Sequence, residues 1–191
     1  MLELEGCSMR HVATILLVVL LGGCRGEDSA SPGLVGAARA GDVAQIRAMA
    51  SEQSDLDAPS GGNGWTPLMH AIHKNQIGSV EALLDGGADP NRPGDEATTP
   101  LMMAAGYGYT DIVTVLLRRG ANPALTNTGG ESALDWALSG MNDIDRFTML
   151  QCQDETVRAL HTAAPRIRPT ASAHRIASFK RCGSLVLWAK T

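Results

Sequence analysis

Large aromatic residues are scarce in this chain of 191 residues, in which Phe, Trp and Tyr together make up 4%. A single globular core usually contains more large rings. Stacked pairs of helices, by contrast, can be built from Leu, Ala, Val and Ile. Cysteine is also rare, and the four cysteines, Cys7, Cys24, Cys152 and Cys182, form no CxxC pair. Zinc ribbons and thioredoxin-like redox sites are therefore not expected.

The motifs of common catalytic and phosphate-binding sites are missing as well. No G-x-S-x-G segment presents a serine nucleophile, and the Gly-rich stretches at 60–64 and 128–130 lack the lysine of a phosphate-binding loop. His70 and His73 have the spacing of a shared metal site, but no third ligand is in register with them. We therefore expect a non-enzymatic protein with no cofactor and no metal ion.

Clustered positive charge is absent from the main body of the chain. Residues 24–164 contain nine Lys and Arg against eighteen Asp and Glu, whereas residues 165–191 contain six Lys and Arg and no acid. Binding to a phosphate backbone needs clustered positive charge, so no nucleic acid is expected as a partner. The basic segment 165–191 is expected to be a disordered tail. It could contact anionic phospholipid, lie against the acidic body, or remain solvated.

One stretch of the chain, however, is repeated. Three landmarks recur after 33 residues, and such a period must be explained before any other feature of the fold. They are Thr66-Pro67-Leu68 with Thr99-Pro100-Leu101, Leu83-Leu84 with Leu116-Leu117, and Gly87-Ala88-Asp89-Pro90 with Gly120-Ala121-Asn122-Pro123. A further step of the same length reaches Ser132-Ala133-Leu134.

Each repeat has the pattern of two short helices. Thr66 is expected to cap the first helix through its hydroxyl group, and Pro67 suits the first helical position because its missing N–H is not needed there. Asn75-Gln76 interrupts the apolar spacing and marks a turn. A second amphipathic helix begins at Ile77 and ends at Gly86-Gly87, where glycine favours a left-handed cap.

This lettering resembles the ankyrin repeat, TPLHxAAxxGHxxIVxxLLxxGAxxN. The resemblance implies an all-α solenoid of about four stacked helix-turn-helix units with short β-hairpin loops. The units are expected at about 34–62, 63–95, 96–128 and 129–164. The first lacks the Thr-Pro opening, and the last carries about eleven inserted residues between its helices. Terminal repeats are commonly atypical because one side faces water.

Two departures from the repeat pattern predict local differences. Met69 and Met102 occupy the histidine position of the motif, which removes the imidazole hydrogen bonds between neighbouring loops and keeps the apolar packing. Ala97 stands where the loop glycine is usual, so this loop is expected to bend differently.

The N-terminus has the pattern of an export signal. Arg10 and His11 precede an unbroken apolar run at 12–21, and small residues follow. The run is too short to span a bilayer, which takes about 20 apolar residues. Leu21-Gly22-Gly23-Cys24 resembles the lipobox of bacterial lipoproteins, which implies cleavage before Cys24 and lipidation of its sulfur. A plain cleaved signal, with Cys24 incidental, is the alternative.

The residues around this signal refine the expectation. Two acids near the start do not suit a basic n-region, so Met9 is an alternative first residue. Arg25 follows the cysteine, whereas an Asp there would favour the inner membrane in lipoproteins, so the outer membrane is implied. We expect residues 1–23 to form the signal peptide and 24–33 to form a tether.

Export would place Cys152 and Cys182 in an oxidising compartment. A disulfide between the tail and the last unit is one possible state of this pair. Two free thiols and a bond to another molecule are the alternatives.

In the ankyrin family, loop tips and the exposed faces of the first helices bind other proteins, usually without chemistry. The resemblance therefore implies a protein-binding module that is monomeric alone, exported to the bacterial periplasm and anchored to the outer membrane through Cys24. By position, the candidate partner-binding residues are Asn63, Trp65, His73, Lys74, Arg92, Asp95, Glu96 and Tyr107.

Three alternative functions remain open. The first is an immunity or inhibitor protein whose acidic concave surface caps a toxic enzyme. The others are an enzyme without a recognisable motif and a structural or stress-protective envelope protein.

Overall fold

The helices of the protein come in pairs, as the repeat predicts. The coordinates are a computed structural model that describes residues 33–52, 54–140 and 153–173, and all of these belong to one compact unit. The pairs are α2 (Leu34–Ala40) with α3 (Val43–Ser51), α4 (Pro67–His73) with α5 (Ile77–Asp85), α6 (Pro100–Tyr107) with α7 (Thr110–Arg118), and α8 (Ala133–Ser139) with α9 (Asp154–Ala163).

Hydroxyl side chains start three of these pairs. The Thr66 Oγ1 atom accepts a hydrogen bond from the Met69 N–H at 3.3 Å, and Thr99 does the same for Met102 at 3.2 Å. Ser132 Oγ caps α8 in the same way, accepting from the Asp135 N–H at 3.4 Å. The predicted N-caps are thus confirmed, because each satisfies a backbone N–H that has no partner within the helix.

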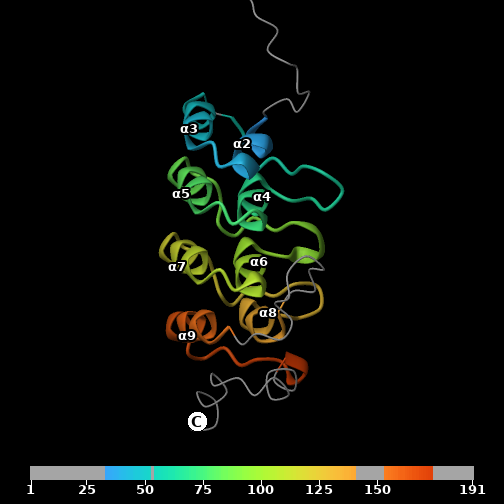
Figure 1. Cartoon of the computed structure of the whole chain (residues 1–191). Coiled ribbons are helices and arrows are strands. Elements are labelled where there is room, and N and C mark those ends of the chain that lie inside the picture. Colours follow the sequence, from blue (N-terminus) through green and yellow to red (C-terminus); the bar gives the residue numbers. More distant parts are fainter. Residues whose placement is uncertain (1–32, 53, 141–152, 174–191) are drawn as a thin grey trace, which may run out of the picture. The chain divides into compact units, whose positions relative to one another are not determined.

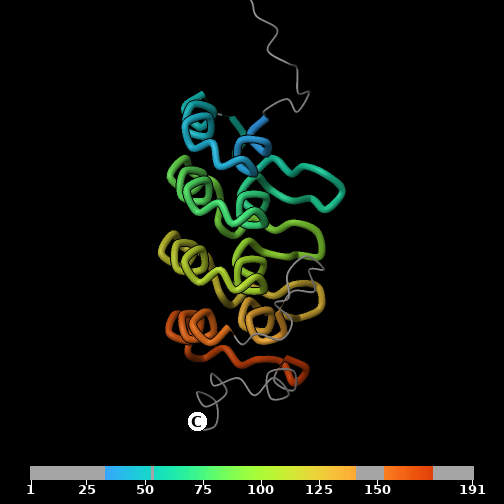
Figure 2. The backbone as a smooth tube through the Cα atoms, in the orientation of Figure 1, coloured from blue at the N-terminus to red at the C-terminus, as the bar shows by residue number. Residues whose placement is uncertain are grey.

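The pairs stack into two columns of helices (Figures 1 and 2). We call the first helix of each pair an inner helix and the second an outer helix. The inner helices α2, α4, α6 and α8 pack on one another in that order, and so do the outer helices α3, α5, α7 and α9. The all-α class predicted from the repeat is therefore confirmed.

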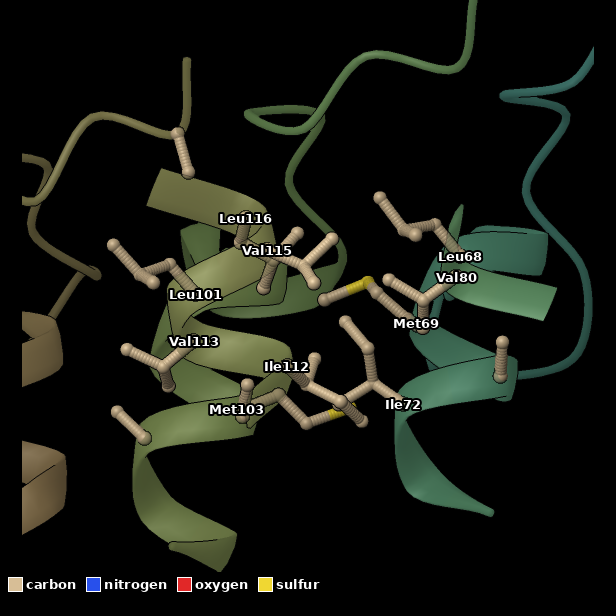
Figure 3. Packing of buried hydrophobic residues seen from close by; sticks show 14 of the residues in the cluster. Leu68, Met69, Ile72, Val80, Leu101, Met103, Ile112, Val113, Val115 and Leu116 are labelled. Atoms are coloured by element: carbon tan, nitrogen blue, oxygen red, sulfur yellow. The ribbon is translucent and has the colours of Figure 1, made fainter. Parts of the chain in front are cut away.

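Apolar side chains between the columns form a continuous core. Figure 3 shows Met69 and Ile72 of α4 pointing toward Met103 of α6 and Ile112 of α7. None of these four side chains is more than 1% exposed. A helical pair cannot bury its apolar face alone, so stacking of neighbouring pairs provides the hydrophobic stabilisation.

The loops between units are short hairpins closed by single antiparallel bridges, Ser60 with Trp65 and Thr126 with Ser132. The loop before α6 differs, as its alanine predicts. It contains a 3₁₀ turn, η1 (Asp95–Ala97), in which Glu96 and Ala97 both have a positive φ of 55° and 59°. Left-handed backbone is costly for residues with a Cβ atom, so this loop carries local strain.

The fourth unit rejoins the stack after its insertion. Residues 141–152 lie outside the described part of the chain, as does the proposed Cys152–Cys182 pair. Just after the insertion, Gln153 Nε2 donates to the Gly106 carbonyl oxygen at 2.9 Å. Thr156 Oγ1 lies 2.7 Å from Thr110 Oγ1. These contacts hold α9 against the third unit.

The folded part continues beyond α9. Thr170 Oγ1 accepts a hydrogen bond from the Ala173 N–H at 3.3 Å, the same pattern that starts α4, α6 and α8. The Thr170 N–H donates to the buried carboxylate of Asp135 in α8, and Ala173 is buried. The expected disorder from residue 165 onward therefore does not hold for residues 165–173, because this segment packs on the last unit. Residues 174–191 lie outside the description.

Side-chain bonds tie the turns of successive units together on the side of the outer helices. The carboxylate of Asp57 accepts from the Asp89 N–H at 3.0 and 3.1 Å. One repeat later, Asn91 Oδ1 accepts from the Asn122 N–H at 2.7 Å, and Asn91 Nδ2 donates to the Gly120 carbonyl at 3.0 Å. The amide of Asn91 makes two kinds of bond, whereas the carboxylate of Asp57 can only accept.

We expect Asp57→Asn to stabilise the protein at neutral pH by about 1 kcal/mol, because the new amide can also donate to a neighbouring carbonyl as Asn91 does. Burial, with Asp89 and Asp55 nearby, raises the pKa of Asp57 above 3.8. The folded state therefore binds this proton more tightly than the unfolded chain does. Stability from Asp57 is fully present below pH 3.8 and is lost as the pH rises through the folded-state pKa.

The gain from Asp57→Asn should accordingly shrink as the pH falls toward 4, which urea denaturation at several pH values would measure. Glu81→Gln, which removes the same charge from the exposed face of α5, is the control and should change little. A gain that grows on acidification would contradict this account.

Candidate protein-binding surface

Backbone hydrogen bonds join the tips of successive loops. The Asp95 N–H donates to the Asn63 carbonyl at 3.1 Å, and the Thr128 N–H donates to the Glu96 carbonyl at 2.8 Å. Gly64 has a φ of +59°, and a side chain at this position would collide with the Asp95 carboxylate. The structure thus brings the predicted residues Asn63, Asp95 and Glu96 together, with all three side chains exposed.

Five rings form a second group along the inner helices. The Trp65 ring centre lies 5.5 Å from that of His70 and 5.3 Å from that of His73. His73 Nδ1 is 2.7 Å from the Tyr107 hydroxyl oxygen, and Tyr107 stacks on Tyr109 at 5.3 Å. These contacts connect the second unit to the third, so the predicted residues Trp65, His73 and Tyr107 do lie together.

Tyr107 is buried, whereas its position in the repeat predicts an exposed binding residue. Its side chain is only 5% exposed, because its hydroxyl contacts His73 and its ring lies between His73 and Tyr109. Its hydroxyl group is within hydrogen-bond distance of the half-buried His73 and thereby holds that ring in place. Trp65 is half-buried.

His70 is a member of this group that sequence reasoning does not assign to the binding surface. Its Nε2 atom lies 3.0 Å from Ser60 Oγ in the preceding loop. This contact replaces the hydrogen bond to a loop that the motif's usual histidine would make and that Met69 cannot make. Burial lowers the pKa of His70 from 6.5, helped by the positive charge of Arg39 and by His73. Its position one residue after the motif's usual histidine was the available clue.

The two predicted cations are placed differently. Lys74 is exposed at the C-terminal end of α4, directly after His73. Arg92 is exposed in the turn beside Asp57 and Asp89, where burial raises the pKa of Asp57 and the charge of Arg92 offsets a small part of that rise. Among the described contacts, none joins Arg92 to the ring group, so the structure does not bring Arg92 to the inner helices.

Charge is divided between the two columns of helices. The inner helices α2, α4 and α6 contain no acidic residue, and the one acid of α8, Asp135, is buried. Acids instead occupy the loop tips and the outer helices. The acidic concave surface of the inhibitor alternative is therefore not uniform: in the described residues, the exposed charges on the inner helices or directly after them are Arg39 and Lys74, and exposed acids lie at the loop tips.

With paired helices, loops and stacking in place, the fold is an ankyrin-repeat solenoid. Two family models agree: residues 63–95 match the ankyrin repeat and residues 83–137 match a model of many ankyrin repeats. Ankyrin solenoids form extended surfaces for binding other proteins, so this is a protein–protein interaction fold.

Relatives of known name share these repeats over short stretches. The chain is 31% identical over 120 residues to the rat protein named ankyrin repeat and SAM domain-containing protein 6, covering 62% of this chain and 13% of the relative. It is 35% identical over 78 residues to the mouse 2-5A-dependent ribonuclease, covering 41% of this chain and 10% of the relative. A probable E3 ubiquitin-protein ligase of Oryza sativa subsp. japonica is 38% identical over 100 residues, covering 51% of this chain and 19% of the relative.

The chain spans less than a fifth of the length of these relatives. The similarity therefore concerns the repeats, and it does not extend to the activities that two of the names state.

The predicted lipid attachment residue, Cys24, lies outside the described residues together with the apolar run before it. Within the described ranges, no helix has the length and apolar character needed to cross a membrane. Three or more His, Cys, Asp or Glu side chains in a metal-binding arrangement are likewise not found there.

Proposed function

We propose that this protein is a non-enzymatic binding module of the bacterial cell envelope, which recognises a protein partner through its loop tips and inner helices. The observation that carries this proposal is the ring group around Trp65, which sits beside exposed, hydrogen-bonded loop tips. Trp, Tyr and Arg are the residues most enriched at the energetic centres of interfaces. A half-buried tryptophan on a rigid support suits such a centre.

The location is part of the same proposal. The lipobox-like residues before Cys24 favour export and anchoring to the outer membrane from the periplasmic side. The polar stretch that follows would act as a tether, so the repeat domain could search the space near the membrane.

Trp65→Ala is expected to weaken capture of the envelope partner about thirty-fold, which corresponds to about 2 kcal/mol for a central interface residue. The partner would be identified by cross-linking the full-length, membrane-attached protein in cells, followed by mass spectrometry. Ile77→Ala, on the exposed part of outer helix α5, is the matched control and should bind normally. If the wild-type protein captures no partner, the proposed function is wrong.

A companion variant tests the anchor. Cys24→Ser should move the protein out of the membrane fraction while leaving its affinity for the isolated partner unchanged, because Cys24 precedes the repeat domain. Unchanged membrane fractionation of Cys24→Ser would contradict the lipid attachment and leave the binding surface unaffected.

A further inference from the structure

The exposed ends of the first two inner helices carry positive charge. Arg39 lies in the last turn of α2, and Lys74 follows the last residue of α4. His70 and His73 occupy the last turn of α4. Cations are favoured at helix C-terminal ends because they complement the negative end of the helix dipole. The two inner helices therefore present the same sign of charge at the same end.

These side chains belong to neighbouring units. Inner helix α2 packs on α4, and the charge of Arg39 is close enough to influence the ionisation of His70. His70 and His73 in turn both contact the Trp65 ring. The inner basic surface is the set Arg39, Trp65, His70, His73 and Lys74.

Among the described residues, no ion pair joins an acidic side chain to Arg39 or Lys74. Within the described residues, the recorded ion pair is on the outer helices, between Arg119 and Asp85 at 2.6 Å. Neither Arg39 nor Lys74 has such a partner there. The nearest acid along the chain, Asp42, accepts a hydrogen bond from the Gln45 N–H and caps α3. The surface thus retains net positive charge in a domain that is otherwise acidic.

We infer that the inner basic surface binds an acidic segment of the protein partner, with carboxylates over Arg39 and Lys74 and an apolar residue against Trp65. This inference rests on the proposed binding function and names the chemistry of the partner. Complementary charge speeds association and selects among partners, and a tryptophan beside the charges adds apolar contact. The acidic loop tips at Asp95 and Glu96 would repel the same carboxylates, so they set the direction in which the segment lies.

Charge reversal with a matched control tests this. The variant Arg39→Glu with Lys74→Glu reverses the inner basic surface, and Arg47→Glu with Arg118→Glu makes the same change on exposed outer-helix positions. Poly-L-glutamate serves as the probe for the full chain, measured by fluorescence anisotropy at low salt. The inner variant should bind about tenfold more weakly than the outer variant. The basic C-terminal segment is the same in both variants, so its contribution cancels.

Equal affinities of the two variants for poly-L-glutamate would overturn the inference. So would a poly-dT oligonucleotide that binds more tightly than poly-L-glutamate and loses affinity in the inner variant, because the surface would then be a phosphate site. Both variants should show the same circular dichroism and melting as each other.

Capture of the envelope partner distinguishes a failure of this inference from a failure of the proposed function. If the inner variant captures the partner as well as the wild type, the inference fails and the proposed function stands. If wild-type protein captures no partner, the proposed function fails whatever poly-L-glutamate does.

Discussion

Ile112→Ala is expected to lower the free energy of unfolding by about 3 kcal/mol, within the range seen for large-to-small changes at buried sites. Ile112 is 1% exposed in α7; it faces Ile72 across the boundary between the second and third units, and Met103 within its own unit (Figure 3). Truncation would leave a cavity at an interior interface of the stack. Urea denaturation followed by circular dichroism would measure the loss.

Ile46→Ala makes an informative comparison, because the same residue type is equally buried in α3 of the first unit. Within the described residues, the one unit that packs on it is the second. The stability of such a stack is approximately the sum of the stabilities of its units and of the interfaces between them. A destabilising substitution in a terminal unit should therefore cause local unfolding of that unit before the whole domain unfolds. Hydrogen exchange should then accelerate in the first unit of the Ile46 variant alone. Equal acceleration throughout both variants would contradict this nearest-neighbour picture.

Asp135→Ala is expected to cost a similar amount, about 3 kcal/mol, through loss of hydrogen bonds to a buried charged group. The Asp135 carboxylate is 1% exposed and accepts from the Ser132 N–H at 2.8 Å and the Ser132 hydroxyl at 2.6 Å. It also accepts from the Thr170 N–H. Removing it leaves buried donors without partners and detaches residues 165–173 from α8.

Limited trypsin digestion would report the detachment through cleavage after Arg166, which lies in that segment. Asp135→Asn should lose less stability than Asp135→Ala, because the amide oxygen can still accept from Thr170 while its NH₂ group cannot accept from Ser132. Cleavage of Asp135→Ala at the wild-type rate would show that other contacts hold the segment.

Local features of this fold were readable from the sequence. The hydroxyl groups of Thr66 and Thr99 accept hydrogen bonds from residues three positions further on. Both partners of each bond therefore lie within four consecutive residues of the sequence. The 33-residue period then specifies that the pairs stack. The site was harder to predict, because Tyr107 is covered by His73 from the previous unit. Helical spacing alone places Tyr107 on an exposed face.

Two features were missed for different physical reasons. The charge of the whole body is negative, and a sum over residues conceals that Arg39 and Lys74 lie on inner helices while the acids lie elsewhere. Thr170 repeats the capping pattern of Ser132, but at a distance that breaks the period. Pro165 and Pro169 beside it favour an irregular segment, and the contact with Asp135 is visible only in three dimensions.

The segment around Thr170 also bears on self-association. A stack of similar units offers one apolar end that resembles the faces buried inside it, and such an end can accept the first unit of another molecule. Repeated head-to-tail contacts of this kind produce open filaments rather than closed oligomers. Residues 165–173 pack against α8 at this end of the described stack, so we expect the residues that lengthen the fold also to hinder such addition.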